Sequence, residues 1–281
     1  MTEHPFWKLG LVGNPIAHSL SPRIHRAALE NAGLRGVYAL HEVQASGLDD
    51  ILDSLRNRDI HGLNVTVPFK QLVLRKCDRL GPVAEVSGAV NTLALKGDEL
   101  IGYNTDVIGL EQALVDQWPT RPWRGRSCTI YGAGGAARAA GIALFNLGAG
   151  ELRITNRTRH RALELASTLA DRVGIPCRSV EEMEAFDGSS LVIQATTQGV
   201  EDDQADRIVK HAAKLMERTA PDCVAMDLVY APSLPPFARG ARMAGRQSIG
   251  GLPMLVNQAR QSFTIWTGKD VPASCLAPAL K

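Results

Sequence analysis

The sequence predicts an α/β protein of two α/β domains, and three observations carry this prediction. Short apolar runs alternate with longer segments of helical spacing, a pattern typical of sheets covered by helices. A run of glycine and alanine at residues 132–137 follows one apolar run and opens an alanine-rich helix. The length of 281 residues exceeds the usual size of one compact domain. We therefore expect an N-terminal domain and a Rossmann-type domain.

In the first hundred residues, the apolar runs are the predicted strands. Strands are expected at KLGLVG, GVYALHEV and IHGLNVTVP, and helices at SPRIHRAALENAGL and GLDDILDSLRN. Ser21 is the expected N-cap of the first helix, because a serine hydroxyl accepts a backbone N–H there and Pro22 suits the first helical position. A strand pair follows in AVNTLALKGDELIGYNTD, with its turn at Gly97 and Asp98, and leads into a helix at VIGLEQALVDQW.

The second half continues the alternation around the glycine run. The runs CTIY, ELRIT, LVIQAT and VAMDLVY are predicted strands, and MLVNQARQSFTIWTG has helical apolar spacing. We place the domain boundary near Asp106. Residues 1–106 form the first domain, completed by a C-terminal helix over 253–281, and residues 107–252 form the Rossmann domain.

Composition argues against several classes of function. Basic and acidic residues number 31 and 29, so the net charge of +2 offers no footprint for nucleic acid. Five scattered cysteines without a C-x-x-C pair disfavour disulfides and structural zinc and favour the cytoplasm. The histidines lack metal-binding spacing, and no metal is expected. No run approaches the roughly 18 apolar residues of a membrane span, and no signal peptide is evident. The chain is expected to be a monomer or a homodimer.

The glycine run is the predicted cofactor site. Gly132 permits a tight turn, Gly134 lets the backbone approach a pyrophosphate, and amides at the helix start bind its charge. The alternative is the glycine-rich helix start of any α/β protein. The residues of the predicted site are Gly132, Ala133, Gly134, Gly135 and Ala136.

The strand after the glycine helix indicates NADP(H) rather than NAD(H). An NAD site places a carboxylate at this strand end to bind the ribose hydroxyls. Here ELRIT is followed by Asn156, Arg157 and Thr158, and then by Arg161. A guanidinium donates paired hydrogen bonds to a 2′-phosphate, whereas a carboxylate would repel it. The alternative is that Arg157, Arg159 and Arg161 are a solvated cluster at a helix start.

Four polar clusters end apolar segments in the N-terminal half: GNPIAHSLSP, NVTVPFK, GAVNT and NTD. Together with GAGGAAR, NRTxxR, DLVY and GLxMLVxQ, in the same order along nearly the whole chain, they resemble the shikimate dehydrogenases. The resemblance implies NADP-dependent interconversion of 3-dehydroshikimate and shikimate by hydride transfer, in a cleft between the two domains. Two alternatives stay open: a dehydrogenase of quinate or another analogue, and a ligand-binding regulator without catalysis.

The functional residues of that family match positions in this chain. Lys70 and Asp106 match its catalytic pair, in which an ammonium polarises the ketone and supplies a proton; a surface lysine and a helix cap are the plain alternatives. Ser19 and Ser21 match the pair that binds the substrate carboxylate at a helix start. Further matches are Asn64, Thr66, Asn91, Tyr230 and Gln258 for the substrate, and Thr196 and Met254 for the cofactor.

Four positions depart from the usual pattern of that family. Val107 and Gln194 stand where glycine and asparagine are usual, and Ala231 and Gly250 where asparagine and aspartate are common. We expect the β-branched residue after Asp106 either to change the local backbone or to crowd the pocket, and the longer amide to shift the cofactor. Two polar groups are missing from the expected substrate side, which keeps quinate or an analogue open as substrate.

Overall fold

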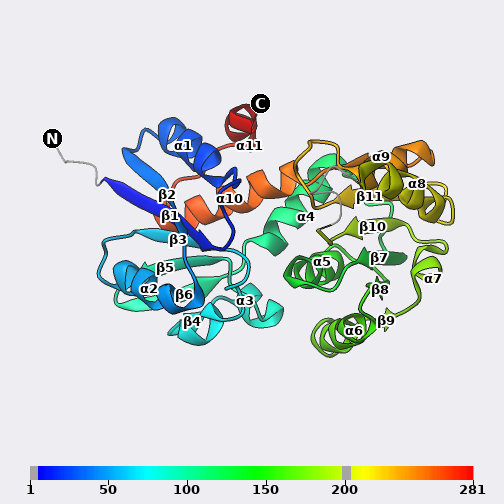
Figure 1. The fold of residues 1–281 in the computed structure, drawn as a ribbon, viewed down its shortest axis with the longest axis horizontal. Helices are drawn as coiled ribbons and strands as arrows, with labels where there is room; N and C mark the ends of the chain where they lie inside the picture. Colours follow the sequence, from blue (N-terminus) through cyan, green and yellow to red (C-terminus); the bar gives the residue numbers. More distant parts are fainter. Residues whose placement is uncertain (1–5, 198–203, 281) are drawn as a thin grey trace. The chain divides into compact units, whose positions relative to one another are not determined.

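The computed structural model describes residues 6–197 and 204–280 and divides the chain into two compact units. The first unit joins Met1–Gly109 to Val256–Lys281, and the second is Leu110–Leu255. Each unit contains a six-stranded sheet with helices beside it (Figure 1), so the α/β class is confirmed. Within the described ranges, no helix is both long and apolar enough to cross a membrane.

The sheet of the first unit is mixed and has the order β2-β1-β3-β5-β6-β4. β1 pairs in parallel with β2 and β3, whereas β5 is antiparallel to β3 and β6. The β5–β6 pair turns at Gly97, as predicted, with a left-handed φ of +61°. The strands are β1 (Trp7–Gly13), β2 (Gly36–Glu42), β3 (Gly62–Val65), β4 (Arg79–Leu80), β5 (Thr92–Lys96) and β6 (Glu99–Tyr103).

The two faces of this sheet bury different side chains, because successive residues of a strand point to opposite sides. Leu63 of β3 packs in an apolar cluster with the leucines of α2 (Leu48–Arg56). The neighbouring Asn64 bonds to Ser262 of α10 (Leu252–Thr267) instead. The other helical segments of this unit are α1 (Ser21–Asn31), α3 (Pro82–Ser87), α11 (Ala273–Leu276) and the 3-10 turns η1 (Ala45–Gly47), η2 (Val73–Lys76) and η4 (Ala277–Leu280).

Two predicted helix boundaries are wrong. α1 begins at Ser21 itself, with Leu20 in the N-cap position, and it is the hydroxyl of Ser19 that accepts the N–H of Ser21, at 3.2 Å. The single helix expected over 253–281 ends at Thr267, because Gly268 has a left-handed φ of +68°, a conformation that ends helices. Apolar spacing did not reveal this break.

The second unit is a Rossmann-type domain, as predicted. Its sheet has the order β12-β11-β10-β7-β8-β9, and every pair in it is parallel, which is the doubly wound order with a switch point between β7 and β10. Its strands are β7 (Ser127–Tyr131), β8 (Glu151–Thr155), β9 (Cys177–Ser179), β10 (Leu191–Gln194), β11 (Val224–Asp227) and β12 (Gln247–Ile249).

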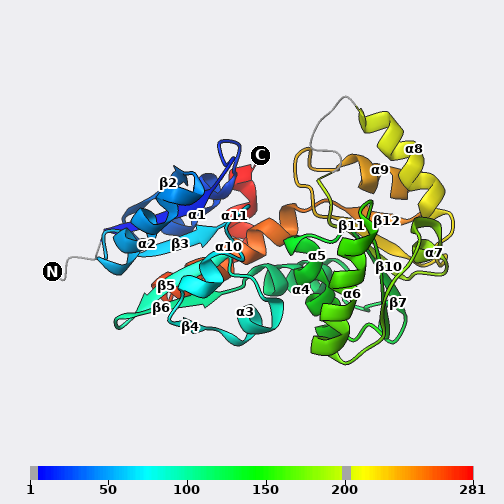
Figure 2. The same cartoon turned by 60° about the horizontal axis from the view of Figure 1, so that its bottom comes forward.

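Helices cover both faces of this second sheet. α5 (Gly135–Asn146) and α6 (Arg159–Val173) lie on one face, and α8 (Ala205–Met216) and α9 (Pro236–Met243) on the other (Figure 2). The short α7 (Glu182–Phe186) precedes β10, and α4 (Asp106–Gln117) leads into the unit from the first one. The carboxyl ends of β7, β8 and β10 therefore meet at one edge, where ligands bind in such sheets.

His25 of α1 is fully buried in the first unit. Its ring stacks on that of Tyr38, with centroids 4.3 Å apart and planes 3° from parallel, and lies 5.3 Å from the ring of Trp266. Burial lowers the pKa of His25 to about 3, and the side chain of Asn64 offsets only part of this effect. The imidazole is therefore neutral near pH 7, and protonating it opposes folding.

We predict that His25 destabilises the fold in acid. The pKa of His25 is about 3 in the folded protein and 6.5 in its ordinary state, so between these pH values only the unfolded chain takes up the proton. Its contribution to the free energy of unfolding should fall by about 1.4 kcal/mol for each pH unit below about 6. His25→Phe keeps a stacked ring and removes this contribution. Denaturant unfolding of both proteins at about pH 7.5 and about pH 5 measures the difference.

Asp227 also titrates in this pH range, but its effect on the free energy of unfolding is opposite to that of His25. Burial raises the pKa of Asp227 to about 7, so the folded protein binds this proton more tightly than the unfolded chain does. The contribution of Asp227 to the free energy of unfolding therefore increases as the pH falls. This contribution is common to both proteins and cancels in their comparison. An equal loss of stability in the two proteins between these pH values would contradict the assignment to His25.

Candidate active site

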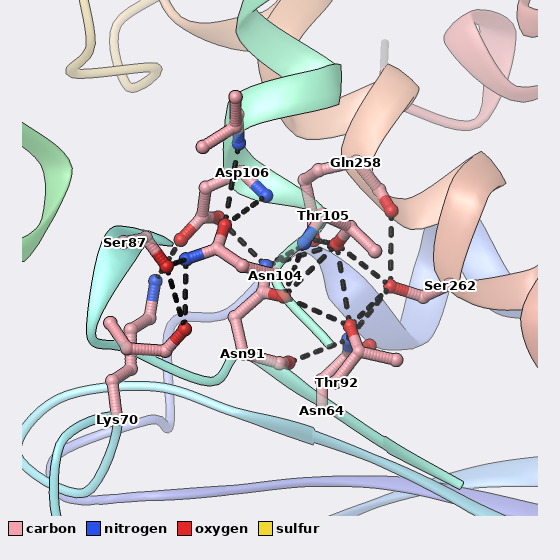
Figure 3. Close-up of polar contacts among 12 residues, drawn as sticks. Asn64, Lys70, Ser87, Asn91, Thr92, Asn104, Thr105, Asp106, Gln258 and Ser262 are labelled. Carbon is pink, nitrogen blue, oxygen red and sulfur yellow. Dashed lines mark hydrogen bonds and ion pairs between the residues drawn. The ribbon is translucent and has the colours of Figure 1, made fainter. Parts of the chain in front are cut away.

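Lys70 and Asp106 form a hydrogen-bonded ion pair in the first unit. Nζ of Lys70 donates to Oδ2 of Asp106 at 2.6 Å (Figure 3). The two side chains are 22% and 11% exposed. Lys70 lies in the loop after β3, where its carbonyl accepts the N–H of Val90 at 2.9 Å. An ammonium has three N–H donors, so one bond to Asp106 leaves others for a ligand oxygen.

Asn91 is the second donor to Asp106. Its Nδ2 donates to Oδ1 of Asp106 at 2.9 Å, and its own Oδ1 accepts the backbone N–H of Thr105 at 2.7 Å. A backbone N–H only donates, so this bond identifies the oxygen end of the amide and leaves the nitrogen end facing Asp106. Both oxygens of Asp106 thus accept a hydrogen bond, one from Lys70 and one from Asn91, as a carboxylate requires.

The start of α4 is capped by Asn104 rather than by Asp106. Oδ1 of Asn104 accepts the N–H of Asp106 at 3.0 Å and that of Val107 at 3.4 Å. Its Nδ2 donates to the hydroxyl of Ser87 and the carbonyl of Ala89, each at 3.0 Å. Val107 is fully buried in the first turn of α4.

Three buried hydroxyls lie beside this pair, on Thr92, Thr105 and Ser262. Each residue is at most 1% exposed, and the hydroxyl oxygens lie 2.8 to 3.3 Å apart. Asn64 donates from Nδ2 to Thr92 and Ser262, each at 3.0 Å, and to the carbonyl of Asn91 at 3.1 Å. One network therefore joins β3, β5, the start of α4 and α10 (Figure 3).

Ser19 and Ser21 stand together at the start of α1. Ser21 is buried, and Ser19 is partly exposed in the loop before it. Tyr38 of β2 donates to Oδ1 of Asn64 at 2.9 Å. Burial raises the pKa of Tyr38, and a hydrogen bond with Ser21 offsets part of this rise. The serine pair is thereby linked to the network at Asn64.

The other predicted substrate residues differ in their surroundings. Oε1 of Gln258 lies 3.4 Å from the hydroxyl of Thr105 and 3.5 Å from Nδ2 of Asn91, inside the network. Thr66 follows β3 and is partly buried. Tyr230 belongs to the second unit, where it follows β11, and burial raises its pKa. The structure thus brings Asn64, Asn91 and Gln258 together with Asp106.

The glycine run lies at the carboxyl end of β7. Gly132 has φ +129°, and a Cβ on it would lie 2.8 Å from the carbonyl oxygen of Ala195. Gly134 occupies the N-cap position of α5, and no atom of the described residues lies within 4 Å of a Cβ built on it or on Gly135. The space on the Cβ side of both glycines is therefore open beyond their chain neighbours and their own helix, and free amides at a helix start suit an anion. Ala133 and Ala136 flank this space and are partly exposed.

The arginines after β8 divide into two kinds. Arg159 pairs with Glu181 at 2.9 Å, and both side chains are more than 70% exposed. Arg157 and Arg161 are exposed and form no ion pair within the described part of the chain. Arg157 and Arg161 are therefore the ones available to bind an anion.

Two side-chain amides shape the loops at this edge. Nδ2 of Asn156 donates to the carbonyl of Thr158 at 3.0 Å, directly after β8. Gln194 is fully buried at the end of β10, and its Oε1 accepts the N–H of Thr196. The longer amide of Gln194 thus folds back onto the backbone of a predicted cofactor residue.

The loop after β11 explains another departure from the family pattern. A Cβ on Gly250 would lie 2.4 Å from the carbonyl oxygen of Ser233, so no side chain fits at position 250. Ala231 lies in the same loop and is exposed, and Met254 lies in the first turn of α10 and is partly buried. A side chain at position 250 would therefore require the 228–235 loop to move.

Sequence reasoning missed several residues of this network. Thr92, Asn104 and Thr105 lie within the GAVNT and NTD clusters, in which only Asn91 and Asp106 were predicted as functional residues. Ser262 lies one helical turn after Gln258, on the same side of α10, and this spacing was the available signal. In the sequence, Tyr38 looks like an ordinary aromatic residue of a β-strand.

Comparison with known proteins identifies the family. A family model described as the shikimate dehydrogenase substrate binding domain matches residues 11–93, and one described as the shikimate 5'-dehydrogenase C-terminal domain matches residues 251–281. A shikimate dehydrogenase (NADP(+)) of Methanopyrus kandleri is 36% identical over 277 residues, covering 97% of this chain and 94% of that protein.

Solved structures agree with this assignment. The shikimate 5-dehydrogenase of Thermus thermophilus, in complex with NADP(H) and shikimate, matches with a TM-score of 0.83 and 34% identity, covering 98% of both chains. A quinate dehydrogenase of Corynebacterium glutamicum, in complex with NAD, matches with a TM-score of 0.85 and 27% identity, also over 98% of both chains. The sequence identity over nearly the whole chain shows that this protein belongs to the shikimate dehydrogenase family.

Proposed function

We propose that this protein interconverts 3-dehydroshikimate and shikimate with NADPH and NADP⁺. The observation that carries the proposal is the Lys70–Asp106 pair at 2.6 Å, bordered by the buried amides of Asn64 and Asn91. An ammonium held by a carboxylate is the group that a ketone reduction needs at its oxygen. The curated relative from Methanopyrus kandleri carries the name of this activity.

Lys70 is the proposed proton donor. NADPH, when bound, supplies the hydride that reduces the ketone carbon. As the carbonyl oxygen gains negative charge, the Lys70 ammonium stabilises it and transfers a proton to it, which leaves a hydroxyl and a neutral amine. Asp106 holds Nζ in place, and Asn91 holds Asp106. The amine then recovers a proton from water, which reaches the 22% exposed side chain; shikimate oxidation runs these steps in reverse.

Asn64 is proposed to recognise a substrate hydroxyl. Its two N–H groups are occupied by the carbonyl of Asn91 and the hydroxyls of Thr92 and Ser262, and its oxygen already accepts from Tyr38. Neither ring nitrogen of the neighbouring His25 makes a hydrogen bond within the described residues. A carbonyl-type oxygen has two lone pairs, so beside the bond from Tyr38 Asn64 can only accept one further hydrogen bond. It therefore favours a hydroxyl over a ketone oxygen, and the ketone is left to Lys70.

The substrate carboxylate is proposed to bind at Ser19 and Ser21. Two hydroxyls and the start of α1 can bind an anion without a basic side chain. In the second unit, Arg157 and Arg161 are proposed to bind the 2′-phosphate of NADP(H), and the first amides of α5 its pyrophosphate. Thr66, Gln258 and Tyr230 complete the proposed substrate contacts, and Thr196 and Met254 those of the cofactor.

We also propose that the enzyme works in the cytoplasm, as a monomer or a homodimer, on a small-molecule substrate and without nucleic acid. All five cysteines are free thiols, which suits a reducing compartment. Desolvation raises the pKa of Cys128, Cys177 and Cys223, so these thiols are poor nucleophiles near neutral pH.

Quinate is the second candidate substrate. The structural likeness to a quinate dehydrogenase and the missing polar side chains at Ala231 and Gly250 favour it. Values of kcat/KM for shikimate and quinate, each with NADP⁺ and NAD⁺, test the proposal. We expect the highest value for shikimate with NADP⁺, and a higher value for quinate with either cofactor would replace shikimate as the substrate.

We predict that Lys70→Ala lowers kcat by about 10²- to 10⁴-fold, because the oxygen of the ketone loses its proton donor. The variant should still fold and bind NADPH, since Asp106 keeps its bond to Asn91. Steady-state reduction of 3-dehydroshikimate measures the loss, and NADPH fluorescence titration checks the binding. A turnover close to that of the unmodified protein would remove Lys70 from the mechanism.

We predict that Arg157→Ala raises the KM for NADPH by about ten- to a hundredfold and leaves that for NADH nearly unchanged, because only NADPH carries the 2′-phosphate. Arg159→Ala is the matched control, since Arg159 is already paired with Glu181. The two cofactors are compared in the same assay with 3-dehydroshikimate. Equal losses with NADH and NADPH would exclude the 2′-phosphate role.

A further inference from the structure

Ser262 of α10 has more polar partners than its position in a helix requires. A serine inside a helix ordinarily bonds to the carbonyl four residues earlier, and Ser262 does so with Gln258 at 3.0 Å. Its oxygen also lies 3.0 Å from Nδ2 of Asn64, 2.8 Å from the hydroxyl of Thr92 and 3.1 Å from that of Thr105. The side chain is fully buried, and Figure 3 shows these contacts.

Two backbone groups fix the direction of the hydrogen bonds around Ser262. The N–H of Thr105 can only donate, so it faces the oxygen of Asn91 at 2.7 Å. The carbonyl of Asn91 can only accept, so it faces the nitrogen of Asn64 at 3.1 Å. Asn64 is consequently a donor toward Ser262. The hydroxyl hydrogen of Ser262 can then serve the carbonyl of Gln258 while its oxygen accepts.

Hydrogen bonds connect Asn64, the proposed substrate contact, to the proposed catalytic pair of Lys70 and Asp106. From Asn64 the contacts pass through Ser262 to Thr105, whose hydroxyl accepts from Asn91 at 3.0 Å, and Asn91 in turn donates to Asp106. Asn64 and Asn91, at the two ends of this path, are each held by a backbone group. Between them the path consists of the hydroxyls of Ser262 and Thr105. A displacement of Asn64 is thus resisted by Ser262 from the side of α10.

Along the links described above, the network is not suited to carry protons to the solvent. Its hydroxyls are at most 1% exposed, and the links to Asp106 and to Tyr38 pass through the amide groups of Asn91 and Asn64. An amide donates its N–H without losing it, because it is not an acid at physiological pH. The function of the hydroxyls is therefore geometric, and Lys70 exchanges its proton through its own exposed part.

We propose that Ser262 is a positioning residue, which holds Asn64 in the orientation that binds a substrate hydroxyl. This inference rests on the proposed function, in which Asn64 accepts a hydrogen bond from a substrate hydroxyl. Removing the hydroxyl leaves the N–H groups of Asn64 with the carbonyl of Asn91 and the hydroxyl of Thr92. The amide keeps its partners but loses the one on α10.

The test is Ser262→Ala, which removes one buried oxygen atom. A typical hydrogen bond contributes about 0.5–1.5 kcal/mol net, so the KM for 3-dehydroshikimate should rise about three- to tenfold. The kcat should stay within about twofold, because Lys70 and Asp106 keep their own contacts, and the KM for NADPH should not change. A purely structural serine would lower the melting temperature and leave the KM for 3-dehydroshikimate unchanged.

The matched control is Thr264→Val on the same helix. Thr264 makes the same kind of bond, at 3.1 Å to the carbonyl of Arg260, and lies outside the network. Removing the hydroxyl of Thr264 should leave the KM for 3-dehydroshikimate and the KM for NADPH unchanged. A double-mutant cycle identifies the route: in an Asn64→Ala background, Ser262→Ala should change the KM for 3-dehydroshikimate by less than about twofold.

Three results would overturn the proposal. The first is an unchanged KM for 3-dehydroshikimate in Ser262→Ala, and the second is an equal rise in KM with and without Asn64. The third is a parallel rise in the KM for NADPH with loss of folded protein, which circular dichroism would detect. Failure of the unmodified protein to reduce 3-dehydroshikimate counts against the proposed function instead, so the two failures are distinguishable.

Discussion

The hydrogen bond from the backbone N–H of Thr105 to the oxygen of Asn91 is the constraint on which the polar arrangement of the first unit depends. It orients one amide, and that amide turns its N–H groups toward Asp106. If the amide were reversed, its oxygen would face the carboxylate and repel it. A carboxylate with a donor on each oxygen is held in one orientation, and it presents the Lys70 ammonium in one position.

Among the residues labelled in Figure 3, Lys70 and Asp106 carry charge and the others are neutral. Burying an ion pair is unfavourable unless further hydrogen bonds satisfy the charged groups. Asn91 meets that need for Asp106, and the partly exposed Lys70 retains contact with water. Amides and hydroxyls at Asn64, Thr92 and Ser262 add directional contacts without further charge, so the field at Lys70 is set mainly by its own partner.

The fold could be predicted from the sequence because its signals are local. Alternating apolar runs, the turn at Gly97 and the glycine run before α5 each act within a few residues. The errors concern where helices begin and end. At the start of α1, the hydroxyl of Ser19 rather than that of Ser21 accepts a backbone N–H, and Gly268 ends a helix whose apolar spacing continues beyond it. Ser262 escaped notice for another reason, since its partner Asn64 lies 198 positions away and no sequence spacing encodes that contact.

The return of α10 to the first unit has a consequence for the synthesis of the chain. Asn64 and Asp106 leave the ribosome early, but the hydroxyl that braces Asn64 follows only after the whole Leu110–Leu255 unit has been made. Until then, β3 carries a polar side chain facing a surface that α10 will cover. The contact that closes this face of the sheet can therefore form only after the second unit has been synthesised.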